Sequence, residues 1–217
     1  MKYLTPQELF DLSECSFPKL FDQVEYVWEV LPKIKSFLTT LPLGKHEGKI
    51  SPQAYLEDPH LIYIAPGVVV EAGAYIKGPC YIGKNTEVRH GAYIRGLAII
   101  DEECVVGHTT EVIRSVFLKG AKAGHFAYIG DSILGNHVNL GAGTKLANLR
   151  LDRKEIQIKW DGKKIPTGLK KFGAILGDRA ETGCNSVTNP GTIMGKESVC
   201  YPCFNGSGVV PEKGVCR

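Results

Sequence analysis

The chain has 217 residues, of which 43% are hydrophobic and 23% charged, with a formal net charge of +3. This balance excludes a disordered chain and a strongly basic nucleic-acid-binding protein. No apolar run reaches the roughly 18 residues that a membrane span needs, so we expect neither a membrane nor a nucleic-acid partner. The seven cysteines and the polar opening segment predict reduced thiols and a cytoplasmic location.

Residues 1–60 are expected to form a helical N-terminal module and a connector. Apolar side chains recur at helical spacing in the first part, and residues 43–60 contain the glycine, proline and histidine typical of a connector. Pro32 should bend or divide the longer helix because it lacks a backbone N–H. The helical positions are Leu20, Val24, Val27, Trp28, Leu31 and Ile34.

Residues 61–217 show a period of six. The residues four positions after each repeated aliphatic residue are nearly all small. Neither a helix nor an alternating strand gives this double pattern, whereas a three-sided coil of 18 residues does, with short strands stacked about 4.8 Å apart. Such coils bury their faces only against neighbouring coils, so the pattern predicts a mainly β solenoid. The repeated positions are Ile64, Val70, Ile76, Ile82, Val88, Ile94, Ile100, Val106, Val112 and Leu118.

The repeat is interrupted twice. Leu118 and Leu134 are 16 residues apart where three repeats need 18, and we place the two missing residues near Gly124 and His125, where an irregular wall could admit a ligand. Residues 150–172 leave the repeat, and Asp161-Gly162 between two strand-like segments predicts an inserted β-hairpin. The repeat resumes with Leu176, Thr182, Thr188, Met194 and Cys200, a register preferred over the one that runs from Ile175 to Val199.

His125 is the first candidate for chemistry. A neutral imidazole near pH 7 can take a proton from an attacking amine or hydroxyl, and the expected irregularity lies at the same place. The alternative interpretation is a surface histidine on a turn.

Metal binding is a rival hypothesis. His90 and His108 are 18 residues apart, so they should stack on adjacent coils, and some proteins that resemble γ-class carbonic anhydrases bind zinc on such coils. Only these two histidines match the spacing, so no metal site is expected. Cys200, Cys203 and Cys216 lack a second ligand pair at zinc-finger spacing and are expected to pack in tight corners.

Two segments carry a family resemblance. Residues 122–149, KAGHFAYIGDSILGNHVNLGAGTKLANL, resemble the acetyltransferase domain of bifunctional N-acetylglucosamine-1-phosphate uridyltransferases/glucosamine-1-phosphate acetyltransferases. Residues 150–177 are more similar to archaeal-type sugar-1-phosphate nucleotidylyltransferases. The resemblance implies a left-handed parallel β-helix of hexapeptide repeats with a short α-helical N-terminal module, assembled as a homotrimer.

The resemblance also implies residue roles. His125 corresponds to the catalytic base. Asn139 and Lys154 would assist the transfer, Arg95, Tyr128 and Asn148 would bind the amino-sugar phosphate, and Ala142 and Cys184 would contact acetyl-CoA. The chain departs from the bacterial pattern at Ile113, which replaces a phosphate-binding lysine, and at Cys184, which replaces a serine.

We therefore expect an acetyl-CoA-dependent N-acetyltransferase that acts on an amino-sugar phosphate or nucleotide sugar, as in cell-envelope biosynthesis, without a metal. The alternative is a non-catalytic module that binds a sugar nucleotide or a separate nucleotidyltransferase. Nucleotidyltransferase activity in this chain is not expected, because residues 1–60 lack the Gly-rich loop that wraps nucleotide phosphates.

Overall fold

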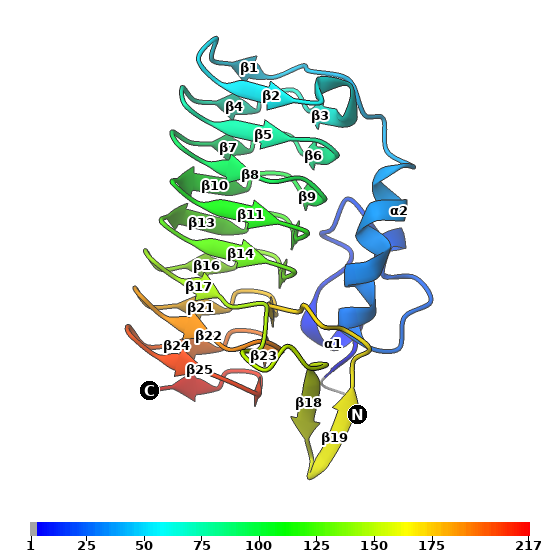
Figure 1. The fold of residues 1–217 in the computed structure, drawn as a ribbon, viewed down its shortest axis with the longest axis vertical. Helices are drawn as coiled ribbons and strands as arrows, with labels where there is room; N and C mark the ends of the chain where they lie inside the picture. The colour runs from blue at the N-terminus through cyan, green and yellow to red at the C-terminus, as the bar shows by residue number, and fades with distance from the viewer. Residues whose placement is uncertain (1–3) are drawn as a thin grey trace.

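The computed structural model describes residues 4–217, which form a left-handed parallel β-helix with helical segments along one side (Figure 1). Each coil passes in turn through three parallel sheets of nine, eight and eight strands, here called face 1, face 2 and face 3. Face 1 consists of β1 (Lys49–Ile50), β4 (Val69–Val70), β7 (Glu87–Val88), β10 (Val105–His108), β13 (Lys122–His125), β16 (Asn139–Leu140), β21 (Glu181–Thr182), β24 (Val199–Cys200) and β27 (Val215–Cys216).

The other two faces follow the same order. Face 2 consists of β2 (Tyr55–Glu57), β5 (Tyr75–Lys77), β8 (Tyr93–Ile94), β11 (Glu111–Ile113), β14 (Tyr128–Gly130), β17 (Lys145–Leu146), β22 (Val187–Thr188) and β25 (Asn205–Gly206). Face 3 consists of β3 (Ile62–Ile64), β6 (Cys80–Ile82), β9 (Ala98–Ile100), β12 (Val116–Phe117), β15 (Ile133–Leu134), β20 (Ala174–Leu176), β23 (Thr192–Met194) and β26 (Val209–Val210). The short helix η4 (Pro59–Leu61) leads into β3.

The core is the column of aliphatic side chains inside the coils. Val70 pairs with Val88 and Ile76 with Ile94, one coil apart, and all four are buried. This confirms the repeat predicted from Ile64 to Val112. Leu176, Thr182 and Met194 point inward as well, whereas Ile175 packs outside the coils, so the preferred C-terminal register is also confirmed.

The predicted position of the irregularity is wrong. Phe117, not Leu118, is the interior residue, because Phe117 pairs with Ile100 in the coil before and with Leu134 in the coil after, 17 residues away on each side. The two missing residues are therefore removed one at a time, at the corner between faces 2 and 3. Arg114 and Asp131 occupy this corner with positive φ angles of 43° and 50°. The six-residue period does not show which of the adjacent apolar residues 117 and 118 points into the coil.

The N-terminal module covers the outside of face 3 (Figure 1). Its segments α1 (Pro6–Leu9), η2 (Pro18–Phe21), η3 (Val27–Lys33) and α2 (Ile34–Leu38) are short, and η3 runs directly into α2. Pro32 lies inside η3, so a 3₁₀ segment replaces the first part of the expected helix. Trp28 is buried and packs near Phe172, in one apolar cluster with Ile99, Ile133 and Ile175 of face 3. None of the helices within residues 4–217 is both long and apolar enough to cross a membrane.

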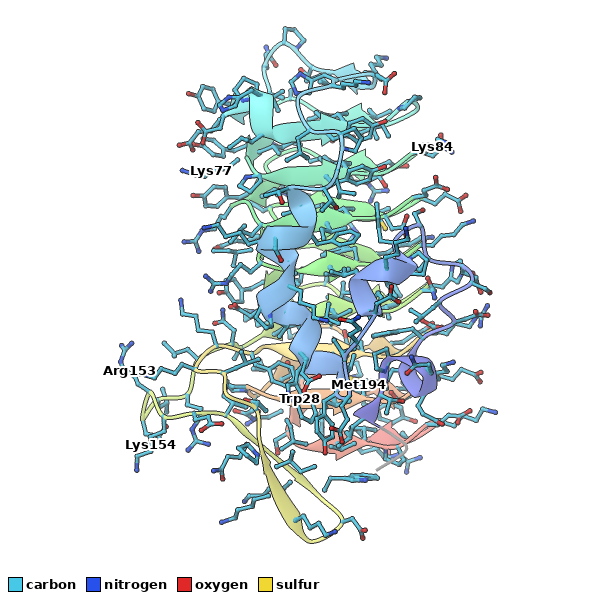
Figure 2. The ribbon with its side chains drawn as sticks, turned by 90° about the vertical axis from the view of Figure 1, so that its right-hand side faces the viewer. Trp28, Lys77, Lys84, Arg153, Lys154 and Met194 are labelled. Carbon is cyan, nitrogen blue, oxygen red and sulfur yellow. The ribbon has the colours of Figure 1, made fainter. Side chains whose placement is uncertain are left out.

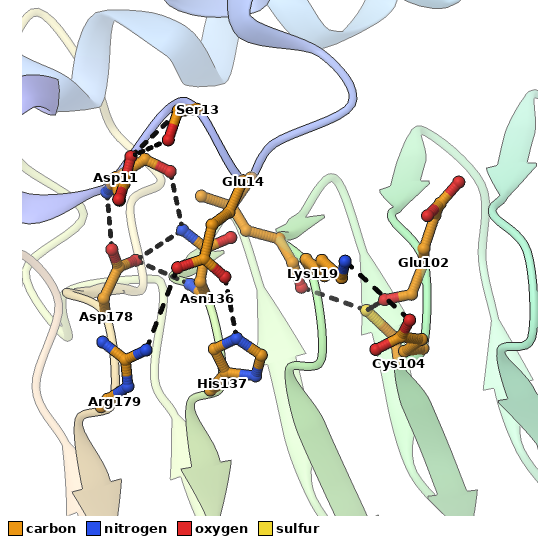
Figure 3. A network of polar contacts seen from close by, with 12 residues as sticks. Asp11, Ser13, Glu14, Glu102, Cys104, Lys119, Asn136, His137, Asp178 and Arg179 are labelled. Atoms are coloured by element: carbon orange, nitrogen blue, oxygen red, sulfur yellow. Dashed lines mark hydrogen bonds and ion pairs between the residues drawn. The ribbon is translucent and has the colours of Figure 1, made fainter.

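Buried polar contacts fix this module to the coils (Figure 3). The Asp178 carboxylate accepts hydrogen bonds from the backbone N–H groups of Asp11, at 2.6 Å, and Asn136, at 2.7 Å. Nε2 of His137 and Oε2 of Glu14 lie 3.0 Å apart beside these bonds. These bonds link residues far apart in the sequence and hold the module in one position on face 3.

The inserted hairpin has the predicted form. Strands β18 (Gln157–Trp160) and β19 (Lys163–Pro166) pair in antiparallel register across Asp161 and Gly162. Both turn residues have positive φ, 51° and 70°, as a two-residue turn of type I′ requires. Ile158 on the inner side of the hairpin is buried in the apolar cluster between face 3 and the N-terminal module, which anchors the insertion.

Candidate active site

His125 ends β13 on the corner between faces 1 and 2. Its register partner in the previous coil is His108. The side chain of His125 is exposed, and within residues 4–217 neither ring nitrogen forms a hydrogen bond; the ring contacts Phe126 with centroids 6.5 Å apart. Both nitrogens are therefore open to a ligand.

Three of the other predicted site residues share a groove with His125. The groove has a volume of about 560 Å³ and is lined by His125, Asn139, Ala142 and Cys184, together with charged side chains of face 1 that include Arg89 and Lys122. We call it the His125 groove. The stacking of the coils explains why these residues meet: the carbonyl of His125 accepts the N–H of Gly143, and that of Ala142 accepts the N–H of Asn185. His125, Ala142 and Cys184 thus follow one another along one corner, in consecutive coils.

Two glycines, Gly124 and Gly141, shape the lining of this groove. A Cβ on Gly124 would meet no atom within 4 Å, so the missing side chain leaves space beside His125. A Cβ on Gly141 would lie only 2.6 Å from the backbone nitrogen of Cys184, so glycine there allows the coils to approach closely. Gly124 and Gly141 thus bring main chain into the lining of the groove, beside its charged side chains.

Arg95, Tyr128 and Asn148 form a separate group on face 2 and its corner with face 3. Arg95 donates to the Glu111 carboxylate at 2.7 Å. Burial is the main cause that raises the pKa of Tyr128, and the neighbouring Glu111 raises it further, while a hydrogen bond with Asn148 lowers it. A Cβ on Gly130 would lie within 2.7 Å of the Tyr128 hydroxyl and the Asn148 amide, so glycine lets the two side chains meet.

Two further residues belong to this group and were not among the predicted site residues. Arg114 donates from Nε to one oxygen of Asp131 at 2.5 Å and from Nη2 to the other at 3.1 Å, and the Asp131 side chain is only 7% exposed. Asn148 donates to the same carboxylate at 2.5 Å. The available signal was the shortened repeat, since Arg114 and Asp131 occupy the two shortened corners. Together with Arg95, Tyr128 and Asn148 they form what we call the Arg95 cluster. In this cluster the cation of Arg114 lies one position after Ile113.

Lys154 lies apart from both groups. It follows β17 in the loop before the hairpin, its side chain is exposed, and its backbone N–H donates to Asp152 at 3.2 Å. Figure 2 shows Lys154 and Arg153 at the outer edge of this loop, away from the coils. Within one chain the structure does not bring Lys154 to His125 or to the Arg95 cluster.

His90 and His108 stack as the spacing predicts, with ring centroids 5.5 Å apart and planes inclined by 12°. Nδ1 of His90 donates to the carbonyl of Ala72 at 2.7 Å, and Nδ1 of His108 donates to the carbonyl of His90 at 2.9 Å. The two rings are parallel, and each is fixed by a carbonyl of the coil before it. No group of three or more potential metal-binding side chains occurs within residues 4–217.

The cysteines have two kinds of environment. Cys200 faces the interior and pairs in register with Cys216, and burial together with that neighbour raises the pKa of Cys200 to about 12. Cys184 and Cys203 are exposed.

Comparisons with known proteins place this geometry in a family. The protein-family model described as the GMPPB C-terminal domain matches residues 76–216. The bifunctional sugar-1-phosphate nucleotidylyltransferase/acetyltransferase of Sulfurisphaera tokodaii is 35% identical over 175 residues, which are 81% of this chain and 43% of that protein. The bifunctional protein GlmU of Methanococcus maripaludis is 32% identical over 185 residues, again 82% of this chain and 43% of the relative.

The chain thus spans less than half the length of these curated relatives. Among solved structures, the Francisella novicida UDP-N-acetylglucosamine acyltransferase aligns with a TM-score of 0.41 and 14% identity, over 78% of this chain and 66% of that one, which is too weak a likeness to carry an argument. The family model, however, covers well over half of the chain. The chain therefore belongs to the GMPPB C-terminal domain family.

Proposed function

We propose that this protein is an acyltransferase that moves an acetyl group from acetyl-CoA to the amino group of an amino-sugar phosphate or a nucleotide sugar, with His125 as general base. The observation that carries the proposal is the His125 groove, where an imidazole with two open nitrogens lies beside Asn139, Ala142 and Cys184. The similarity to bifunctional nucleotidylyltransferase/acetyltransferases supports this reaction class.

The residue types fit the chemistry of direct transfer. The acceptor amine attacks the thioester carbonyl, the C–N bond forms as the C–S bond breaks, and the departing thiolate of CoA takes up a proton. His125 removes the proton from the attacking amine, which general-base catalysis makes about 10²–10⁴ times faster. The Asn139 amide or a backbone N–H of the glycine-bounded wall stabilises the oxyanion. No metal takes part.

The Arg95 cluster is the proposed site for the acceptor phosphate. Arg95 and Arg114 present two guanidinium groups on one corner, and planar guanidinium groups bind phosphate with paired hydrogen bonds. Position 113 carries isoleucine where the bacterial pattern has a phosphate-binding lysine. Arg114, which Asp131 holds in place, supplies a cation at the neighbouring position. Lys154 would have to reach this phosphate from its loop.

A homotrimer in the cytoplasm completes the proposal. The N-terminal module covers face 3, so faces 1 and 2 remain open, and they meet at the corner that carries His125. In a ring of three copies, face 1 of each chain lies against face 2 of the next. The His125 groove, which runs along face 1, then lies against face 2 of the neighbouring chain, whose far corner carries the Arg95 cluster.

Release of free CoA thiol from acetyl-CoA tests the function, with glucosamine-1-phosphate and UDP- and GDP-linked amino sugars as acceptors. We expect turnover with one of them and its loss in His125→Ala. Mixing His125→Ala with Arg95→Ala chains should restore part of the activity, because some interfaces would contain both intact groups. Binding of a sugar nucleotide without turnover on any acceptor would instead favour a non-catalytic module that partners a separate nucleotidyltransferase.

A further inference from the structure

A second groove, of about 700 Å³, lies between the inserted hairpin and the last coils. The loop contributes Arg150 and Asp152, the hairpin Gln157 and Lys159, and the coils Asn189 and Ser207. We call it the hairpin groove. Its volume falls in the range of about 300–1,000 Å³ that is usual for small-molecule sites. None of the functional residues described above lines it.

The segment that forms one wall of this groove has a larger net positive charge than the whole protein. Residues 150–172 contain eight Lys or Arg and three Asp or Glu side chains, a net charge of +5, whereas the whole chain carries +3. The rest of the chain is therefore slightly acidic. Such a concentration of one sign beside a groove raises the local concentration of anions.

Two of these charges face each other directly. Lys159 and Lys164 are cross-strand partners in the hairpin, and neither forms an ion pair within residues 4–217. Like charges at opposed positions destabilise a strand pair, so the hairpin gains nothing from this arrangement by itself. Ile158 and Ile165 lie next to the lysines in each strand and point to the opposite side of the hairpin. They pack against the apolar cluster and anchor the hairpin there. Lys159, which lines the groove, and its cross-strand partner Lys164 are thus held on a fixed support, and neither has an ion-pair partner among the described residues.

The remaining lining suits a planar, partly apolar ligand. Leu149 and Pro190 provide an apolar wall, and Leu151 at its rim has a fully exposed side chain. Asn189 uses its amide nitrogen on Asn205 and Gly206, which leaves its oxygen as an acceptor. Ser207 adds a hydroxyl group. These groups match the ring, the exocyclic amine and the sugar hydroxyls of a nucleoside.

We propose that the hairpin groove binds a nucleoside diphosphate, with the diphosphate against Lys159 and Lys164 and the base over the apolar wall at Leu151. The inference deepens the proposed function, and it rests on that function for the source of the ligand. A nucleotide-linked acceptor and acetyl-CoA both contain a nucleoside diphosphate, so either substrate could place that part here.

Isothermal titration of the full chain tests the proposal with UDP, GDP and 3′-phospho-ADP, the nucleotide portion of CoA. We expect saturable binding of at least one of them, weakened at least tenfold by Lys159→Ala/Lys164→Ala. Binding should also weaken as salt is raised, because exposed charges are screened. The matched control is Lys163→Ala, which removes one charge from the same hairpin on the side of Trp160. The double variant should melt at the same temperature as the parent or higher, since it removes a like-charge pair.

The outcomes separate the two sources. Binding of UDP or GDP alone assigns the groove to the acceptor, and binding of 3′-phospho-ADP alone assigns it to the donor. The proposal is overturned if no nucleotide binds at millimolar concentration, if Lys163→Ala weakens binding as much as the double variant, or if only anionic lipid vesicles or RNA bind. Because the readout is binding, a chain that binds a nucleotide but never transfers acetyl would refute the proposed function and leave the groove assignment intact.

Discussion

His108 and His125 are register partners across β10 and β13, yet only His108 has its ring fixed by a hydrogen bond. Nδ1 of His108 donates to a carbonyl oxygen of the coil before, which also fixes its tautomer because a carbonyl can only accept. The same corner therefore holds one histidine whose ring is fixed by the main chain and one whose ring nitrogens have no hydrogen-bond partner within residues 4–217.

This difference predicts opposite effects of the same substitution. His125→Ala should lower the acetyl-transfer rate by about 10²–10⁴-fold, because a general base is lost, and should leave the melting temperature unchanged. His108→Ala should cost about 1 kcal/mol of stability through its lost hydrogen bond and keep most of the activity. Rates and thermal denaturation of both variants check this, and equal rate losses would rule out a special role for His125.

Gly124 offers a test of the groove that does not touch the base. A Cβ at this position meets no atom within 4 Å, so Gly124→Val should fold normally while its side chain projects into the His125 groove. We expect CoA binding at least tenfold weaker, measured by titration, with an unchanged circular dichroism spectrum. Gly162→Ala, in the hairpin turn, is not a suitable control, because Gly162 has a φ of 70° and the substitution is strained. Normal CoA binding by Gly124→Val would place the donor elsewhere.

Cys184 should be the thiol whose modification blocks the donor. It is exposed in the His125 groove, whereas Cys15 is buried and its pKa is raised to about 12, chiefly by burial. Because the thiolate is the reactive form, N-ethylmaleimide should label Cys184 and Cys203 before Cys15. Labelling should abolish CoA binding in the parent and in Cys203→Ser, but not in Cys184→Ser. Mass spectrometry of the labelled peptides identifies the sites, and inhibition of Cys184→Ser would contradict the prediction.

The Arg114–Asp131 pair should contribute to stability as well as to phosphate binding. Arg114→Ala removes both hydrogen bonds from a carboxylate that is almost fully buried, so we expect the free energy of unfolding to fall by about 1–3 kcal/mol. Arg95→Ala is the matched control, since Arg95 and Glu111 are 41% and 34% exposed and such pairs are worth about 0–1 kcal/mol. Urea denaturation compares the two variants. A larger loss in Arg95→Ala would reverse the assignment.

Asp178 should govern the attachment of the N-terminal module. Asp178→Ala leaves the N–H groups of Asp11 and Asn136 without their acceptor, and the buried N–H of Asn136 costs about 1–3 kcal/mol when it is unsatisfied. We expect limited proteolysis to cut between residues 10 and 42 while the coils stay intact. Glu14→Ala, which removes the exposed contacts with His137 and Arg179, should leave the module protected. Cleavage within the coils before the module would show that Asp178 acts elsewhere.

Much of the fold could be predicted from the sequence because each coil repeats one physical requirement. Val70, Ile76 and Ile82 point into the interior of one coil from its three faces, so their spacing reports the geometry directly. The turn at Asp161 and Gly162 was equally readable, because few residue pairs accept positive φ at both positions. The position of the shortened corners was not, since Phe117 and Leu118 are both apolar and only packing decides which one points inward.

The site was predictable in part for a related reason. His125, Asn139 and Ala142 lie in a contiguous motif, so the coil geometry brings them together. Arg114 and Asp131 are 17 residues apart and meet because they follow strands that pair in register, so a search at the regular spacing of 18 does not connect them. The distance of Lys154 from both groups depends on the path of a loop that does not follow the repeat.

The two shortened corners have a practical consequence for comparing such chains. An alignment that continues in strict sixes past Val112 is one residue out of phase as far as Ile129, where it would assign Leu118 to the core in place of Phe117, and two residues out of phase from Leu134 onward. Fixing Arg114 and Asp131 as landmarks restores the correct phase. Segments grafted or inserted into this protein should therefore keep Arg114 and Asp131, and the coils should be numbered from that pair.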